Sequence, residues 1–209
     1  MCGSGRFLVP LLQDGFAIHG VDASASMLNA CRARCRSLGL HTILRRQSIE
    51  RIRLNDRYGL VFIPASSLCL VTDPNLLARG LRRLHALLRP GGIFVFEAEL
   101  LAGRPPAGQI RTVREVARPD GARIVFSSVG RYDAVERVQR ERHRYDLIRG
   151  GRKAGTEFED FRLRFHDPEE LSRMLAAAGF RDIRMMKGYA GEPADAGDGS
   201  VIVECRVPA

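Results

Sequence analysis

The 209-residue sequence lacks any long hydrophobic run, and this absence excludes several classes of protein. No uninterrupted apolar stretch reaches the ~18 residues that a membrane-spanning helix needs. The N-terminus also lacks the basic segment and apolar core of a secretory signal. We therefore expect a cytoplasmic protein without a membrane span. A chain of this length suits one domain with a substantial core, with room for a smaller inserted unit.

Lysine is almost absent as well, because Lys153 and Lys187 are the only lysines among 33 basic residues. The formal net charge is nevertheless +9, and the isoelectric point is near 10.0, which would suit binding to nucleic acid. The arginines are dispersed among Asp and Glu in several segments. We therefore interpret most of them as a solvated basic surface, and nucleic acid is the less favoured partner.

Cysteine is sparse, and its spacing matches no common zinc-binding pattern. Of the five cysteines, Cys31 and Cys35 lie four residues apart, but no second Cys/His pair completes a zinc-like spacing. An odd number of cysteines in a cytoplasmic chain is typical of free thiols that pack as small apolar groups. The sequence predicts neither a metal site nor a disulfide.

The most informative stretch is the first two dozen residues, where a glycine-rich turn precedes a helix, a strand and an acidic residue. Gly3 and Gly5 let a ligand approach the backbone, and segment 7–14 has apolar residues at helical spacing. The N-terminus of a helix offers free N–H groups to an anionic group. The apolar run 16–21 predicts a strand, and Asp22 at its end is placed to accept hydrogen bonds from a ribose diol. This order predicts a site for a nucleoside with an anionic tail.

Two nucleoside cofactors compete for such a loop. A dinucleotide fingerprint that begins at Gly3 needs a glycine at position 8, where the chain has Leu8. The run Cys2-Gly3-Ser4-Gly5-Arg6 instead resembles motif I of class I S-adenosylmethionine-dependent methyltransferases, with Met1 in place of the first glycine. This resemblance implies that S-adenosylmethionine is bound by Gly3, Ser4, Gly5, Asp22 and Ala23.

In that family the loop follows a first, central strand, which ends in an acidic residue that binds the methionine amine. The 209-residue sequence begins after the place of that strand. Two expectations remain open: the true start lies upstream, or the protein lacks a central strand and part of its cofactor site.

Three later segments add cofactor contacts that the resemblance implies. Met27 stands near the start of a predicted helix, which lies under the adenosine in the family; a core position is the alternative. Ser48 replaces the family's adenine-binding Asp, and Ile49 stands where an apolar side chain packs on the ring. Ala65 belongs to the loop after the buried strand 58–63, at the edge where ligands of open α/β sheets bind.

A second shared motif is Leu88-Arg89-Pro90-Gly91-Gly92, a helix-to-strand turn before the apolar run 93–97. With motif I at this distance, it implies a Rossmann-like class I methyltransferase sheet with helices on both faces. Residues 1–99 and 166–209 are expected to form this S-adenosylmethionine-binding α/β domain. Within it, Asp73-Pro74 and Asp167-Pro168 predict helix starts, and segments 180–189 and 201–207 predict the closing antiparallel pair, joined by a polar loop over 191–199.

Segment 100–165 departs from the α/β pattern. Its β-like stretches span 109–117, 123–132, 135–148 and 156–165, and turn residues separate them. They predict an antiparallel β-sheet inserted after the fifth strand of the family fold. In small-molecule methyltransferases such an insert covers the acceptor site or forms a dimer surface, so a monomer or a homodimer is expected.

The predicted function is therefore methyl transfer to an O or N atom of a small-molecule acceptor. Transfer from a sulfonium carbon depends mainly on alignment and desolvation, and a general base is needed only for a protonated acceptor. His143, Tyr145, His166 and Tyr189 are candidates for that base, but a structural role is favoured for each. Two alternatives remain: an RNA acceptor, suggested by charge alone, and a truncated, non-catalytic interaction module.

Overall fold

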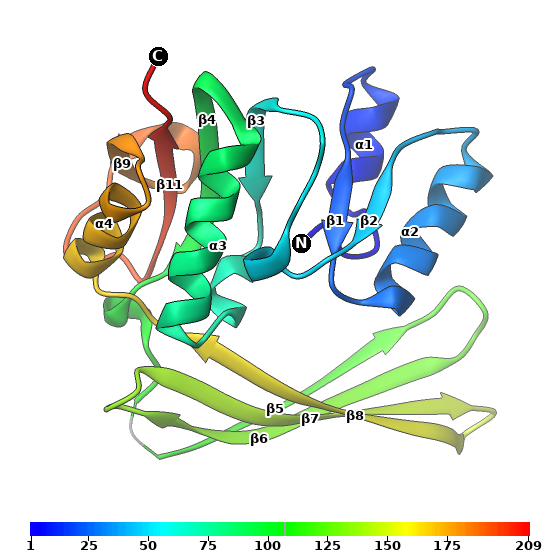
Figure 1. Cartoon of the computed structure of the whole chain (residues 1–209). Helices are drawn as coiled ribbons and strands as arrows, with labels where there is room; N and C mark the ends of the chain where they lie inside the picture. Colours follow the sequence, from blue (N-terminus) through cyan, green and yellow to red (C-terminus); the bar gives the residue numbers. More distant parts are fainter. Residues whose placement is uncertain (107) are drawn as a thin grey trace.

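The computed structural model describes residues 1–106 and 108–209 and confirms an α/β fold accompanied by a separate antiparallel sheet (Figure 1). Its first part contains α1 (Leu8–Gln13), β1 (Gly20–Asp22), α2 (Ala25–Ser37) and β2 (Leu44–Arg46). Strands β1 and β2 pair in parallel. The Ser24 hydroxyl caps α2 by accepting a hydrogen bond from the backbone N–H of Met27.

The first short strand begins later than predicted. The expected strand over 16–21 is reduced to β1. The ladder begins only where Gly20 meets Leu44, and Phe16 remains 61% exposed. An apolar run alone therefore does not fix these boundaries, because strand pairing depends on a partner in register.

A five-stranded sheet forms the centre of the α/β unit. Its order is β10-β9-β11-β4-β3, with bounds β3 (Tyr58–Ile63), β4 (Leu88–Glu99), β9 (Arg181–Lys187), β10 (Glu192–Pro193) and β11 (Ser200–Arg206). Strand β3 is parallel to β4, and the other neighbours are antiparallel. The segment expected to be a loop over 191–199 thus contains the short strand β10. The Arg89–Gly92 motif, which was predicted as a helix-to-strand turn, lies within β4.

The sheet differs from the single continuous sheet that the resemblance implied. Strands β1 and β2 form a two-stranded sheet of their own, and among the described residues no hydrogen-bonded ladder joins β1 to β3. Strands β1 and β3 nevertheless run in the same direction, and the N-terminus lies between them (Figure 1). The Cys2 N–H donates to the Val21 carbonyl at 2.8 Å, so the first residues of the chain lie along β1.

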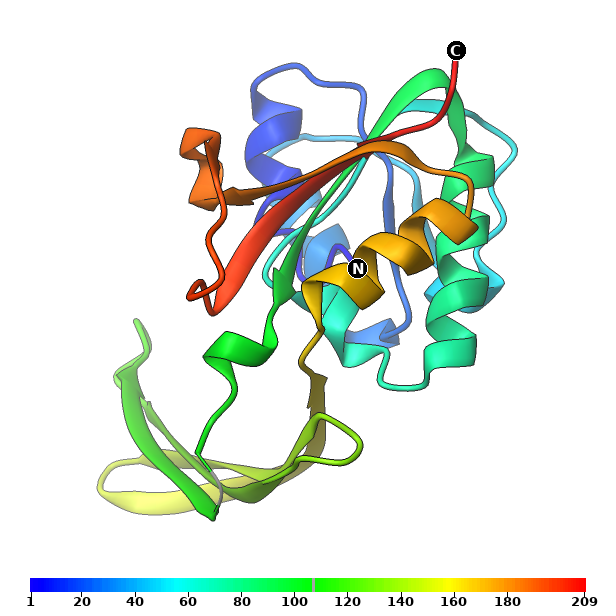
Figure 2. The same ribbon diagram turned by 90° about the vertical axis from the view of Figure 1, so that its left-hand side faces the viewer.

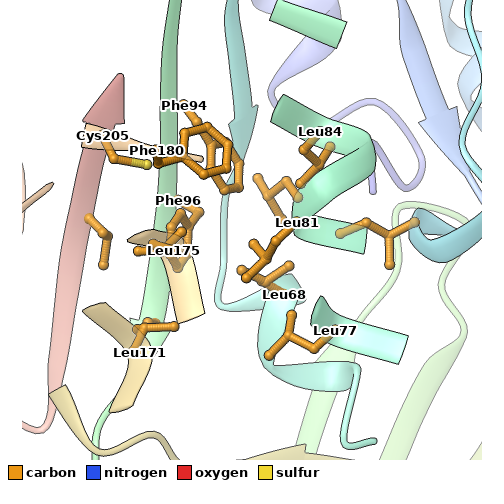
Figure 3. Close-up of a cluster of buried hydrophobic side chains, with 14 of the residues drawn as sticks. Leu68, Leu77, Leu81, Leu84, Phe94, Phe96, Leu171, Leu175, Phe180 and Cys205 are labelled. Carbon is orange, nitrogen blue, oxygen red and sulfur yellow. The ribbon is translucent and has the colours of Figure 1, made fainter. Parts of the chain in front are cut away.

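Two helices cover one face of the five-stranded sheet, namely α3 (Pro74–Leu87) and α4 (Pro168–Ala177) (Figure 2). Each begins with an Asp cap followed by proline, as predicted. Phe94 and Phe96 of β4 meet leucines of both helices in the main core (Figure 3). The labelled members of this core are Leu68, Leu77, Leu81, Leu84, Phe94, Phe96, Leu171, Leu175, Phe180 and Cys205.

Short 3-10 turns stand at the ends of several strands. They are η1 (Ile49–Arg51), η2 (Ser67–Leu70), η3 (Leu101–Gly103) and η4 (Gly188–Ala190). Of the helices in the described residues, none is long and apolar enough to cross a membrane.

The antiparallel sheet has the order β5-β6-β7-β8, with bounds β5 (Gln109–Ala117), β6 (Arg123–Asp133), β7 (Val138–Arg149) and β8 (Arg152–Arg164). Strand β7 begins at Val138 rather than at 135, because Oδ1 of Asp133 accepts the N–H groups of Val135 and Glu136 in the preceding turn. It ends later and β8 begins earlier than predicted, because a tight turn at Gly150-Gly151 leaves Arg149 and Arg152 paired. Figure 1 shows the sheet lying across the end of the α/β unit toward which β1 and β3 point. It therefore faces the edge where open α/β sheets bind ligands.

Candidate functional site

The carboxylate of Asp22 joins the glycine loop to the end of β1. Its Oδ2 accepts the backbone N–H of Gly3 at 2.8 Å, and its Oδ1 accepts the N–H of Ser24 at 2.9 Å. These donors fix the orientation of the carboxylate. A carboxylate has about four acceptor positions, so each oxygen retains capacity for a further donor such as a ribose hydroxyl.

The two glycines of the loop have different surroundings. Both adopt positive φ, +54° at Gly3 and +84° at Gly5. A Cβ on Gly5 would lie 2.7 Å from the sulfur of Cys31, so this glycine lets the loop pack on α2. A Cβ on Gly3 would meet nothing within 4 Å. The open side of the loop is therefore at Gly3, where a ligand can reach the backbone.

The remaining predicted residues of this segment surround the end of β1. The carbonyl of Ser4 accepts a hydrogen bond from Arg34, and the carbonyl of Ala23 accepts one from Arg46. Met27, on the first turn of α2, is 48% exposed rather than part of the core. Its side chain is thus available to a ligand, and its adenine contact stays a prediction.

The segment predicted to recognise adenine contains a carboxylate that the sequence reasoning missed. The hydroxyl of Ser48 donates to Oε1 of Glu50 at 2.5 Å, and this bond lowers the pKa of Glu50. Ile49 is 7% exposed and packs against Gly80 of α3. The core therefore holds Ile49 in place, and a hydrogen bond joins its two neighbours, Ser48 and Glu50. Ser48 and Ile49 stay predicted cofactor contacts.

The loop after β3 is conformationally strained. Ala65 and Ser66 have φ values of 56° and 49°, a left-handed region that non-glycine residues rarely adopt. Two acidic residues of β4 hold them there. The Ala65 N–H donates to Oε2 of Glu97 at 2.9 Å, and the Ser66 hydroxyl donates to Oε1 of Glu99 at 2.7 Å. Such strain concentrates at ligand sites, where the surrounding structure compensates it.

Glu97 and Glu99 were not predicted as site residues. Both follow the apolar part of β4, where a run of alternately buried residues ends in charge, and that pattern was the available signal. Tyr189 lies near Glu97; partial desolvation of its largely exposed phenol, and then the charge of that carboxylate, raise the pKa of Tyr189. The end of β4 thus contributes carboxylates to the same edge as Asp22 and Ala65.

The four candidate bases lie in three different places. His143 and Tyr145 are neighbours on the same face of β7, since they are two residues apart on a strand. Tyr189 is 75% exposed in the turn after β9. His166 is buried at the junction between the two sheets, where desolvation lowers its pKa to about 4.

The residues present therefore fit a nucleoside with a charged tail. Asp22 retains acceptor capacity, Gly3 leaves its side of the loop open, and Glu50 supplies an acceptor suited to an exocyclic amine. Asp22 and Ala65 come from the ends of two strands that point in the same direction (Figure 1). This is the arrangement in which open α/β sheets bind nucleotides.

Comparison with known proteins agrees with this geometry. A family model described as "Methyltransferase domain" matches residues 1–92. A curated relative from Geobacillus sp. (strain WCH70), whose name assigns it provisionally as a methyltransferase, is 25% identical over 96 residues. That match covers 46% of this chain, which spans only 39% of the relative's length.

Solved structures share the fold over the whole chain. An S-adenosylmethionine-dependent methyltransferase from Clostridium acetobutylicum ATCC 824 has a TM-score of 0.86 at 17% identity, covering 100% of this chain and 82% of that one. The methyltransferase CcbJ from Streptomyces caelestis has a TM-score of 0.79 at 25% identity, with 100% and 81% covered. The sugar N-methyltransferase KedS8 from Streptoalloteichus sp. ATCC 53650 has a TM-score of 0.78 at 19% identity, with 100% and 78% covered. The chain therefore has the fold of these S-adenosylmethionine-dependent methyltransferases, and its residues 1–92 match the methyltransferase domain family.

Proposed function

We propose that this protein transfers the methyl group of S-adenosylmethionine to an N or O atom of a small-molecule acceptor. The observation that carries the proposal is the Asp22 carboxylate, held by the amides of Gly3 and Ser24 at the open side of the glycine loop. Bound S-adenosylmethionine supplies an activated methyl group on a sulfonium sulfur. The chain's own residues bind the nucleoside, orient it toward the acceptor and exclude water.

The cofactor contacts follow from the strand ends. Asp22 accepts hydrogen bonds from the ribose hydroxyls, with Ala23 and Met27 beside the nucleoside. Ser48, Ile49 and Glu50 form the adenine side of the site. Gly3, Ser4 and Gly5 face the methionine portion, and Ala65 lies where cofactor and acceptor meet.

A small acceptor is favoured over RNA by the pairing of the arginines on the antiparallel sheet. Arg123 pairs with Glu115 at 2.7 Å, Arg142 pairs with Asp160 at 2.7 Å, and Arg144 pairs with Asp146 at 2.9 Å. Such pairs balance positive charge that would otherwise contact phosphates. The structural relative KedS8, named as a sugar N-methyltransferase, carries the same fold.

Calorimetric titration with S-adenosylhomocysteine tests the proposal. We expect binding with a Kd in the micromolar range, and a loss of at least tenfold in affinity for Asp22→Asn. Asp14→Asn is the matched control, because Asp14 is an exposed aspartate at the end of α1. Equal affinities for the two variants, or no binding by the unmodified chain, would contradict the proposed site.

A further inference from the structure

One face of the antiparallel sheet is turned toward the α/β unit, and we call it the inner face. Leu163 of β8 lies on this face and packs against the main core. Side chains alternate between the two faces of a strand, so every second residue of β8 counted from Leu163, and the β7 residues paired with them, also lie on this face. In order along the chain, the inner face carries Ser128, Glu141, His143, Tyr145, Glu159 and Phe161.

The centre of the inner face is polar where a covering sheet would ordinarily be apolar. His143 is 9% exposed and lies between two carboxylates. Its Nε2 is 3.3 Å from Oε2 of Glu141, and its Nδ1 is 3.5 Å from Oε2 of Glu159. The Tyr145 hydroxyl donates to the same Glu159 oxygen at 3.0 Å. Two carboxylates therefore flank one imidazole on the inner face.

Aromatic rings enclose the imidazole. The ring of Phe161 stacks on His143 with centroids 4.7 Å apart, and Phe126 meets it edge-on at 5.0 Å. Burial, followed by the hydrogen bond to Glu159, raises the pKa of Tyr145 to about 12. The phenol thus remains a hydrogen-bond donor at neutral pH.

Two buried polar atoms of the cluster have no hydrogen-bond partner within the described part of the chain. They are the hydroxyl of Ser128, which is 7% exposed, and Nδ1 of His143. The two residues are directly opposite each other on β6 and β7. Buried polar groups are nearly always satisfied, so an unpartnered pair in register calls for a donor or acceptor from outside the chain.

We propose that this cluster is the acceptor site of the proposed methyl transfer, on which this inference rests, and that it takes an amine. Glu141 and Glu159 hold the acceptor as an ammonium ion, and Ser128 and Tyr145 orient it. The imidazole of His143 accepts one proton from that ion, which leaves the nitrogen lone pair free. The imidazolium formed is stabilised by the two carboxylates beside it.

The step balances. The freed nitrogen lone pair forms the new C–N bond as the methyl–sulfur bond breaks, and the bonding electrons stay on sulfur. The positive charge of the sulfonium passes to the methylated nitrogen, and His143 releases its proton to solvent. An alcohol acceptor would not use the cluster in this way, because it carries no charge for Glu141 and Glu159 to bind.

Matched amine and alcohol probes test the proposal on the full chain. Glucosamine and glucose form one pair, and cyclohexylamine and cyclohexanol form the other. Binding is followed through the imidazole proton signals of His143, assigned by comparison with His143→Gln. We expect each amine, but neither alcohol, to shift these signals. Glu141→Gln and Glu159→Gln should each weaken amine binding at least tenfold.

Asp160→Asn is the matched control, because Asp160 is a carboxylate on the other face of β8, next to Glu159 and paired with Arg142. It should leave amine binding unchanged. Equal binding of amine and alcohol, a failure of both amines to shift the His143 signals, or equal losses for Asp160→Asn and Glu159→Gln would overturn the proposal. Circular dichroism confirms that each variant is folded.

The readout is independent of cofactor binding. Titrations are repeated with and without saturating S-adenosylhomocysteine, whose own affinity is measured by calorimetry. Amine binding without S-adenosylhomocysteine binding would sink the proposed function and leave the amine site standing. S-adenosylhomocysteine binding without a response to either amine would overturn the amine site and leave the proposed function standing.

Discussion

The backbone N–H of Gly3 donates to Oδ2 of Asp22 at 2.8 Å, which joins the first loop of the chain to the end of β1. A loop residue and a strand residue 19 positions apart are thereby held as one unit. A nucleoside bound by Asp22 is consequently next to the open backbone of Gly3. Some substitutions in this loop should therefore reduce the affinity for the nucleoside, and others should reduce the free energy of unfolding.

Gly3→Ala should mainly reduce cofactor affinity, whereas Gly5→Ala should mainly reduce stability. At Gly3 the new methyl group meets open space, so we expect a loss of about 1 kcal/mol in unfolding free energy from the left-handed backbone alone. Affinity for S-adenosylhomocysteine should fall at least tenfold. At Gly5 the added clash with Cys31 should raise the loss of stability to about 2–4 kcal/mol. Urea unfolding and calorimetry measure the two quantities; a larger loss of stability at Gly3 would refute this division.

Glu50 should recognise the amino group of adenine. Because the hydrogen bond from Ser48 lowers the pKa of this carboxyl group, Glu50 is ionised at neutral pH and can accept a hydrogen bond from an amino group. We expect the protein to bind S-adenosylhomocysteine at least tenfold more tightly than S-inosylhomocysteine, in which an oxygen replaces the amino group. Glu50→Gln should reduce that preference, which competition binding measures. A preference unchanged in Glu50→Gln would place adenine elsewhere.

Ile49 and Met27 should differ because only one of them is buried. Ile49→Ala removes packing beneath Gly80 and should cost about 2–4 kcal/mol of unfolding free energy. Met27→Ala changes a side chain that is 48% exposed, and should cost less than about 0.5 kcal/mol while weakening S-adenosylhomocysteine binding several-fold. Chemical unfolding and calorimetry on both variants provide the comparison. Unchanged affinity in Met27→Ala would remove this residue from the adenosine site.

His166 should make stability depend on pH. Its pKa is lowered from 6.5 to about 4 in the folded chain, mainly because it is buried, so below pH 6.5 the unfolded chain binds more protons. Unfolding free energy should therefore fall as the pH drops from about 6.5 to 4, by about 3 kcal/mol. Urea unfolding across this range, compared with His166→Gln, isolates the contribution. His41→Gln, which alters an exposed histidine, should keep the slope of the unmodified chain.

Local patterns in the sequence determined much of the fold. Asp73-Pro74 and Asp167-Pro168 fix helix starts because an Asp cap and a proline at the first turn satisfy local requirements of backbone and hydrogen bonding. The strand at Tyr58–Ile63 was predicted with its observed bounds, but its burial was not: β3 lies at the edge of the five-stranded sheet, and Leu60 is 53% exposed. The order of loop, helix, strand and Asp22 likewise indicated a nucleoside site.

Only the tertiary structure decided which residues meet. The separation of β1 from β3, the hydrogen bond from Ser48 to Glu50, and the two acidic residues that hold Ala65 and Ser66 all depend on contacts that no local pattern encodes. The pairing of Ser128 with His143 depends on strand register, and a slip of one residue would move either side chain to the other face. The sequence thus determined the elements and the class of ligand, whereas strand register and packing decided which side chains surround it.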